Sequence, residues 1–187
     1  MMTRFAAALA AIDAANRADP DLTEGAPATY LYGLRMTDEL AHLSPDASEE
    51  LRLAARGQHI ERWTSPRASY PDGREGYLAW RRDLAAFHAR RVGDIMDKAG
   101  YDPASIDAAG RMIRKEAIKR DAQVQALEDA ICFTFLRWYF APFAAKHPAD
   151  EVERIVRKTA RKMSADARAK ALVSFTLPDA LAAAFRG

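Results

Sequence analysis

The sequence predicts an all-α fold, a single-domain helical bundle over residues 1–187. Ala, Leu, Arg and Glu are abundant, apolar residues recur at helical spacing, and alternating β-branched stretches do not occur. The chain is 49% hydrophobic and 29% charged, which is typical of one globular domain. A chain of this size hides on the order of 70% of its unfolded surface, so it needs no disulfide or metal to fold.

The first two predicted helices flank a segment rich in helix breakers. Residues 3–16 carry Phe5, Leu9 and Ile12 at helical spacing, and the breaker-rich sequence ADPDLTEGAP follows. The second helix is expected to cover about residues 28–43. The three apolar residues of the first helix are expected to point inward.

A third predicted helix carries the first candidate site residue. Ser44 or Ser48 can cap its start. One face of the helix then presents Leu51, Ala55, His59 and Arg62. His59 is therefore expected to point inward.

A long helix is predicted over residues 77–99, after a loop at residues 64–76. Its apolar stripe consists of Trp80, Leu84, His88, Val92 and Ile95, and Gly100 is the expected stop. His88 is therefore also expected to face the core.

Two further helices place carboxylates on inward faces. Asp102 and Pro103 form a strong start signal, and the stripe that follows contains Ile106, Ala109, Ile113 and Glu116. Asp121 is expected to cap the next helix, where Val124, Glu128, Ile131 and Phe135 share a stripe and Asp129 lies one step around. The C-terminal third is expected to supply packing and basic surface.

Charge and apolar content argue against several classes of protein. The net charge of +2 provides no general attraction for nucleic acid or membrane. The N-terminus does not resemble an export signal, and the apolar run at residues 130–143 is too short to cross a bilayer. The single cysteine, Cys132, excludes an internal disulfide and is expected to be a packed thiol. We therefore expect a cytoplasmic protein with no membrane partner.

The polar residues on these stripes suggest a shared interior site. Burying ionisable groups without partners costs several kcal/mol each, so these side chains must pair with each other, with Arg or with a metal. His59, His88 and Asp129 could bind Zn²⁺, Mn²⁺ or Fe²⁺, with Glu116 or Glu128 as the catalytic base. The alternatives are hydrogen-bonded core histidines and carboxylates in solvated ion pairs on helix surfaces.

Cationic and aromatic residues around the predicted loop suggest an anion site. Guanidinium groups bind phosphate or carboxylate through paired hydrogen bonds. The predicted substrate-binding residues are Arg62, Trp63, Arg67, Tyr70, Arg81 and Lys115. The alternative is that Arg67 caps neighbouring carbonyls and that Trp63 fastens the loop to the core.

Three long strings of the sequence closely resemble the family called domain of unknown function 4202. They are LAARGQHIERWTSPRASYPDGREGYLAWRRDLAAFHA, RKEAIKRD and QALEDAICFTFLRWYF. The likeness extends over nearly the whole chain, and it implies no activity.

A more distant resemblance is to the HD-domain superfamily of helical, metal-dependent phosphohydrolases. Its pattern is His, then His-Asp, then a distant Asp; His59 would match the second histidine and Asp129 the distant aspartate. Ile60 stands in place of the motif aspartate, and Tyr32 and Arg35 stand where the first histidine is expected. The resemblance implies that His88 with Glu116 or Glu128 has taken over coordination, or that the pocket keeps only an anion.

These observations leave three functional hypotheses. The first is an HD-like protein that binds a phosphorylated small molecule or nucleotide, with hydrolysis by a metal-bound water. The second is a non-catalytic nucleotide- or RNA-binding module that uses the Arg, Trp and Tyr side chains of the loop. The third is a protein that acts through protein partners at its basic C-terminal third.

Overall fold

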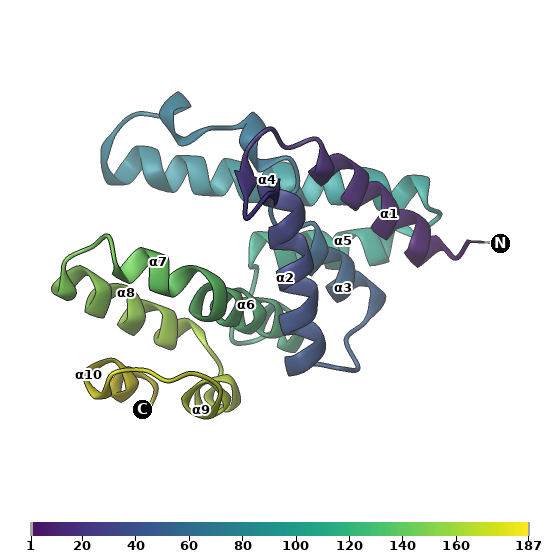
Figure 1. Ribbon diagram of the computed structural model, residues 1–187. Helices are drawn as coiled ribbons and strands as arrows, with labels where there is room; N and C mark the ends of the chain where they lie inside the picture. The colour runs from purple at the N-terminus through teal and green to yellow at the C-terminus, as the bar shows by residue number, and fades with distance from the viewer. Residues whose placement is uncertain (1, 187) are drawn as a thin grey trace.

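The computed structural model describes residues 2–186, which are almost entirely helical (Figure 1). This confirms the predicted all-α class. The helices are α1 (Arg4–Arg17), α2 (Ala28–Leu43), α3 (Glu49–Arg56), α4 (Gly73–Lys98), α5 (Pro103–Arg114), α6 (Ala122–Thr134), α7 (Phe140–Ala144), α8 (Ala149–Lys162), α9 (Ala165–Ser174) and α10 (Asp179–Ala182). The shorter elements are the strands β1 (Leu22–Thr23) and β2 (Ala26–Pro27), the 3₁₀ turns η1 (Arg62–Thr64), η2 (Arg67–Ser69) and η4 (Ala183–Phe185), and the π-helix η3 (Phe135–Tyr139).

Side-chain caps fix several helix starts where the sequence predicts them. Ser48 accepts a hydrogen bond from the backbone N–H of Leu51, and Asp102 and Asp121 cap α5 and α6 in the same way. Each cap satisfies a backbone donor that has no partner inside the helix.

The breaker-rich segment between α1 and α2 folds into a small antiparallel hairpin. Leu22 pairs with Pro27 and Thr23 with Ala26. Glu24 and Gly25 form the turn with φ values of 53° and 78°, as a tight hairpin turn requires. The hairpin turns the chain back so that α2 begins beside the end of α1 (Figure 1).

The third helix ends earlier than its apolar stripe predicts. α3 stops at Arg56, and Gly57, the next residue, lies so close to α4 that a Cβ there would be 2.3 Å from Cγ2 of Val92. His59 therefore lies in a turn and not on a helix. α4 in turn begins at Gly73, four residues before the predicted start at Tyr77.

The predicted continuation of α5 to Glu116 is wrong. The helix ends at Arg114, and Lys115 adopts a left-handed conformation with φ 60° and ψ 37°. Ala117 and Lys119 also have positive φ values of 58° and 68°. Left-handed backbone costs a residue with a Cβ about 1–2 kcal/mol, so this connection between α5 and α6 stores strain.

Ala117→Gly is expected to raise the free energy of unfolding by about 0.5–1 kcal/mol, because glycine adopts φ 58° without a steric cost. Urea denaturation would measure the change. Ala10→Gly, at an exposed position inside α1, is the matched control and should lower stability by about 1 kcal/mol. Equal losses in both variants would contradict the assignment of strain to the 115–119 segment.

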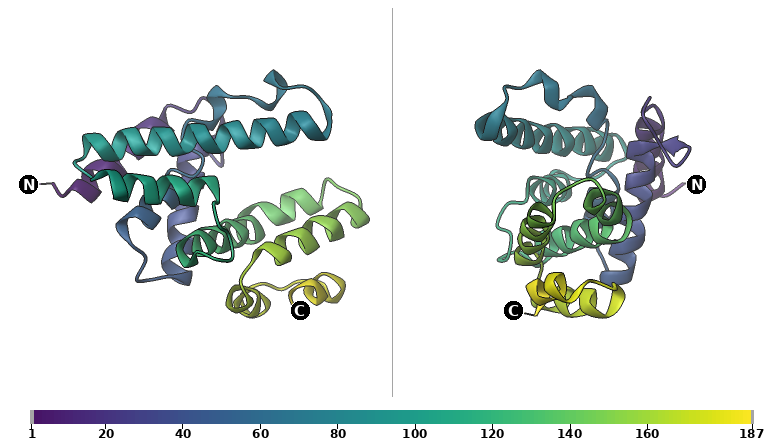
Figure 2. Two further views of the ribbon diagram at one scale, coloured as in Figure 1. Left: turned by 180° about the vertical axis from the view of Figure 1, so that it is seen from behind. Right: turned by 60° about the vertical axis from the view of Figure 1, so that its left-hand side comes forward.

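The helices enclose two hydrophobic cores. The first contains Ile12, Val92 and Ile113 from α1, α4 and α5, together with the beginning of α6. The second contains Phe133 from the end of α6, Val156 from α8, and residues of α9 and η4. α6 therefore belongs to both cores, and Figure 2 shows α4 on one side of it and α8 to α10 on the other.

The end of α6 widens into the π-helix η3. The N–H of Phe140 donates to the carbonyl of Phe135, a bond that spans five residues. Pro142 has no N–H for the carbonyl of Trp138, and its ring crowds that carbonyl, which gives a physical reason for the widened turn. π-helical turns of this kind occur often at functional sites.

Two expectations from composition can be compared with the fold. Within residues 2–186, helices that are both long and apolar enough to span a bilayer do not occur.

Cys132 is buried and free, and its burial raises the pKa of its thiol well above the ordinary range. This confirms a packed thiol.

Candidate functional site

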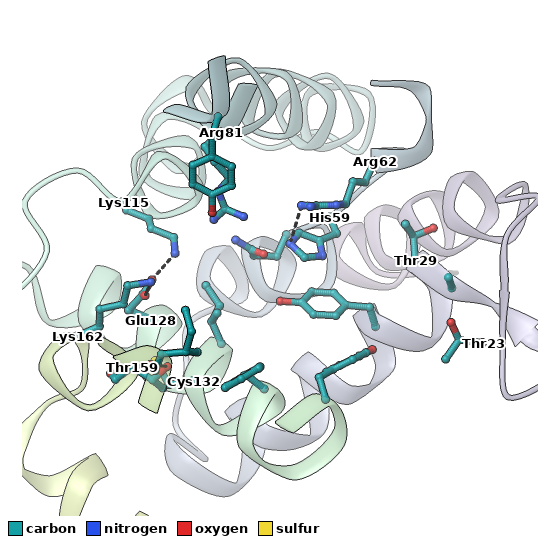
Figure 3. A pocket seen from close by; sticks show the side chains of 18 residues that line it. Thr23, Thr29, His59, Arg62, Arg81, Lys115, Glu128, Cys132, Thr159 and Lys162 are labelled. Carbon is teal, nitrogen blue, oxygen red and sulfur yellow. Dashed lines mark hydrogen bonds and ion pairs between the residues drawn. The ribbon is translucent and has the colours of Figure 1, made fainter. Parts of the chain in front are cut away.

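A cavity of about 460 Å³ lies between the two cores (Figure 3). One wall comes from the hairpin, α2, the turn after α3, α4 and the end of α5, and the opposite wall comes from α6, η3 and α8. A volume of this size fits a small molecule such as a mononucleotide. We call this space the central cavity.

Four cationic side chains and one carboxylate line the central cavity. The cations are Arg62, Arg81, Lys115 and Lys162, and the carboxylate is Glu128. Figure 3 shows the cations extending into the cavity from different walls. The excess of positive charge makes the cavity attractive to an anion.

Glu128 is only 1% exposed and lies between two lysines. Its carboxylate forms an ion pair with Nζ of Lys115 and lies 3.4 Å from Nζ of Lys162. The alternative of a solvated surface pair is therefore wrong for Glu128. Since a buried charge needs a counter-charge, Glu128 holds both lysines at the cavity wall.

Arg62 and Arg81 differ from the two lysines, because neither guanidinium group has a carboxylate partner. Within the described residues 2–186, no carboxylate lies within ion-pair distance of either guanidinium group. Arg62 stacks over the ring of Trp80 at 4.8 Å, and burial and the nearby Arg81 lower its pKa. Two cations thus share one cavity without an acidic partner.

His59 contributes a neutral imidazole to the same wall. Its ring stacks on Tyr32 with centroids 4.0 Å apart, and Nε2 lies 3.5 Å from a guanidinium nitrogen of Arg62. Burial, followed by the charges of Arg62 and His88, holds the pKa of His59 well below 6.5. At neutral pH the ring can therefore accept a hydrogen bond at one nitrogen and donate at the other.

The turn that carries His59 and Arg62 is fastened at Glu61. The Glu61 carboxylate accepts two hydrogen bonds from Arg91 at 2.6 and 2.9 Å, and its backbone N–H donates to Oδ1 of Asn16. Glu61 itself has φ 50°, which a non-glycine residue adopts only where the surroundings require it. These contacts hold His59 and Arg62 in the cavity wall, although both residues lie beyond the end of α3 and not on the predicted helix.

Aromatic side chains form much of the remaining lining. They are Tyr32, Tyr77, Phe135 and Tyr139. Tyr32 and Tyr139 lie with ring centroids 6.0 Å apart, and burial raises the pKa of the Tyr32 hydroxyl well above 10. Such rings can pack against a flat or apolar part of a ligand.

The structure does not bring the predicted metal ligands together. Asp129 faces α9, where it accepts hydrogen bonds from the backbone N–H and hydroxyl of Ser164 at 2.8 and 2.6 Å. It therefore holds the residue that caps α9, and it is absent from the lining of the central cavity. In the described part of the chain, no three side chains of His, Cys, Asp or Glu form a group that could hold a metal ion. The residues present do not fit the predicted metal centre.

Glu116 also lies away from the predicted site. It follows the left-handed Lys115, is exposed, and pairs with Arg114 at 2.6 Å. The alternative of a surface ion pair is therefore the correct one for this residue. His88 is buried, as predicted, and its ring centroid lies 6.0 Å from that of His59.

The side chains of the predicted loop form hydrogen bonds within the loop or with the helix next to it. Arg67 donates to the carbonyls of Tyr70 and Gly73, and the Tyr70 hydroxyl bonds to Asp83. Trp63 does not line the central cavity. Arg67 therefore matches the structural alternative, in which it caps neighbouring carbonyls.

Several cavity residues are missing from the set that the sequence suggests. They are Tyr32, Gln58, Thr159, Lys162 and Tyr139. Tyr32 stands where the HD resemblance places a first histidine, which is the one signal that could have identified it. Lys162 has no such signal, because it resembles any other basic residue at a helix end.

Comparisons with known proteins agree with part of the sequence analysis. The model of one family, described as a domain of unknown function (DUF4202), matches residues 6–184. A search of curated proteins and a search of solved structures gave no match. The resemblance to the HD-domain superfamily therefore stays a prediction.

Proposed function

We propose that this chain, which belongs to the DUF4202 family, binds a phosphorylated small molecule in its central cavity. The observation that carries the proposal is the pair Arg62 and Arg81, which line the cavity without an acidic partner among residues 2–186. Guanidinium groups and phosphate oxygens form paired, charge-assisted hydrogen bonds. Lys115 lies at the same wall and adds a third positive charge.

The rest of the cavity supports a ligand that is more than a bare phosphate. About 460 Å³ exceeds the needs of an inorganic ion, and the lining includes the rings of Tyr32, Phe135 and Tyr139. A phosphorylated compound with a flat or partly apolar body, such as a nucleotide, matches both features. The proposal includes no metal-bound water, because His59, His88 and Asp129 do not converge.

Arg81→Ala is expected to weaken binding of a phosphorylated ligand about 10- to 100-fold, since hydrogen bonds to charged groups contribute about 1.5–3 kcal/mol each. Ribose 5-phosphate and adenosine monophosphate, each beside its dephosphorylated form, would be screened by thermal shift. A ligand at a hundred times its dissociation constant stabilises the folded state by about 2.7 kcal/mol.

Arg90→Ala is the matched control, because Arg90 is exposed on the same helix and is absent from the cavity lining. It should leave the ligand-induced shift intact. The proposal is wrong if no phosphorylated compound stabilises the protein more than its dephosphorylated form, or if Arg81→Ala and Arg90→Ala have equal effects.

A further inference from the structure

A second chamber of about 360 Å³ adjoins the central cavity. The two spaces share the side chains of Gln58, His59, Arg62, Arg81 and Lys115, so the cations lie at their boundary. The remaining walls of the second chamber are mostly from α4 and the end of α5. They include Leu84, Ala85, His88 and Ile113.

Two buried polar atoms in the walls of the second chamber have no hydrogen-bond partner in the part of the chain that the structure describes. They are Nε2 of His88, a residue that is 3% exposed, and Oε1 of Gln58, which is 5% exposed. A buried polar atom without a partner costs about 1–3 kcal/mol, so native proteins leave few of them. Two in one chamber need an explanation.

Both atoms are hydrogen-bond acceptors. Burial and the charges of Arg62 and Arg81 lower the pKa of His88 to about 3, so the ring is neutral at physiological pH. A neutral imidazole carries one proton, so with that proton on Nδ1 the unpartnered Nε2 is left with a lone pair and, like Oε1 of Gln58, requires a donor.

We infer that the second chamber receives a hydroxyl or amino group of the phosphorylated ligand, which donates to His88 and Gln58. This inference rests on the proposed function, because the cations at the boundary hold the phosphate. Arg62, Arg81 and His88 all line this chamber, so the phosphate and the donor group of one small ligand would lie near each other. The ligand class is therefore phosphate esters with a free donor close to the phosphate.

Glycerol 3-phosphate and n-propyl phosphate provide a direct test. They have the same phosphate and the same three-carbon chain, and they differ in two hydroxyl groups. We expect wild-type protein to bind glycerol 3-phosphate about tenfold more tightly in calorimetric titrations, the effect of a buried hydrogen bond.

Two substitutions test whether the second chamber causes the preference for glycerol 3-phosphate. His88→Phe and Gln58→Met each remove an acceptor while nearly preserving side-chain volume, and each should reduce the preference toward a ratio of about one. Two variants at different positions keep the test valid if one of them fails to fold, as judged by circular dichroism. Arg90→Ala should retain the wild-type ratio.

The outcomes separate this inference from the proposed function. If wild-type protein binds both probes equally and Arg81→Ala weakens both, the second chamber does not recognise a donor, although the anion site stands. A preference that survives in both His88→Phe and Gln58→Met also overturns the inference. If neither probe nor inorganic phosphate binds, the proposed function fails and this inference fails with it.

Discussion

Asp13→Ala is expected to lower the free energy of unfolding by about 3–5 kcal/mol, the usual cost of leaving one partner of a buried ion pair alone. The Asp13 carboxylate accepts two hydrogen bonds from Arg56 at 2.6 and 2.9 Å. The Arg56 side chain is only 8% exposed and also donates to Oγ1 of Thr37. Without Asp13, its charge would remain buried with no carboxylate to balance it.

Urea denaturation at pH 7 would measure this loss, and two further variants define its cause. Asp13→Ala combined with Arg56→Met should recover most of the stability, because an apolar side chain needs no counter-charge. Glu153→Ala breaks an exposed pair with Arg157 on α8 and should cost less than about 1 kcal/mol. A loss in Asp13→Ala no larger than in Glu153→Ala would show that the buried pair is not stabilising.

The ion pair between Asp13 and Arg56 also supports the candidate site. Arg56 is the last residue of α3, and Gln58 and His59 follow it in the turn that lines both chambers. Arg56 therefore ties the end of α3 to α1 immediately before the chain enters the site. Loss of Asp13 is expected to loosen this turn as well as the first core.

Helix positions were largely predictable because their signals are local. The stripe with Trp80, Leu84 and Val92 is buried, and Asp102 and Asp121 cap the helices that they were expected to cap. A helix start needs only a side-chain acceptor and nearby backbone donors, all within a few residues. Such contacts can be read from sequence without knowledge of the fold.

Helix ends were less predictable, and the errors at the site follow from this. Spacing places Glu116 on the inner face of a helix, but the helix ends at Arg114 and the left-handed Lys115 directs the chain elsewhere. α3 likewise ends before its predicted end, where Gly57 lies in close contact with α4, although His59 still reaches the cavity. Periodicity cannot anticipate an end that tertiary contacts impose.

The site was predicted in part. His59, Arg62, Arg81, Lys115 and Glu128 all line the central cavity, as the convergence of polar residues suggested. Apart from Glu128, the residues of the opposite wall were missed, because the position of that wall depends on how the second core packs against the first. Contacts between α2 and α6 are separated by about half of the chain, so no local pattern encodes them.

Lowering the pH from 7 to 5 is expected to destabilise the protein by about 2 kcal/mol through His88 alone. The folded state has a His88 pKa of about 3, whereas the ordinary value is 6.5. Below pH 6.5 the unfolded chain binds a proton that the folded protein does not accept, so stability falls with acidification at about 1.4 kcal/mol per pH unit. The lowered pKa of His59 acts in the same direction.

The pH window distinguishes these histidines from the carboxylates. Glu61 and Asp102 also have lowered pKa values, but they lose their contribution only as the pH falls below about 4.5, near their unfolded values. Urea denaturation at pH 7 and pH 5 would therefore report mainly on histidine. His88→Phe should reduce the pH dependence by about 2 kcal/mol, and His42→Gln, at an exposed position, is the matched control. An identical pH dependence in wild-type protein and His88→Phe would mean that His88 is protonated as easily in the folded state as in the unfolded chain, and the neutral acceptor required by the second chamber would then be absent.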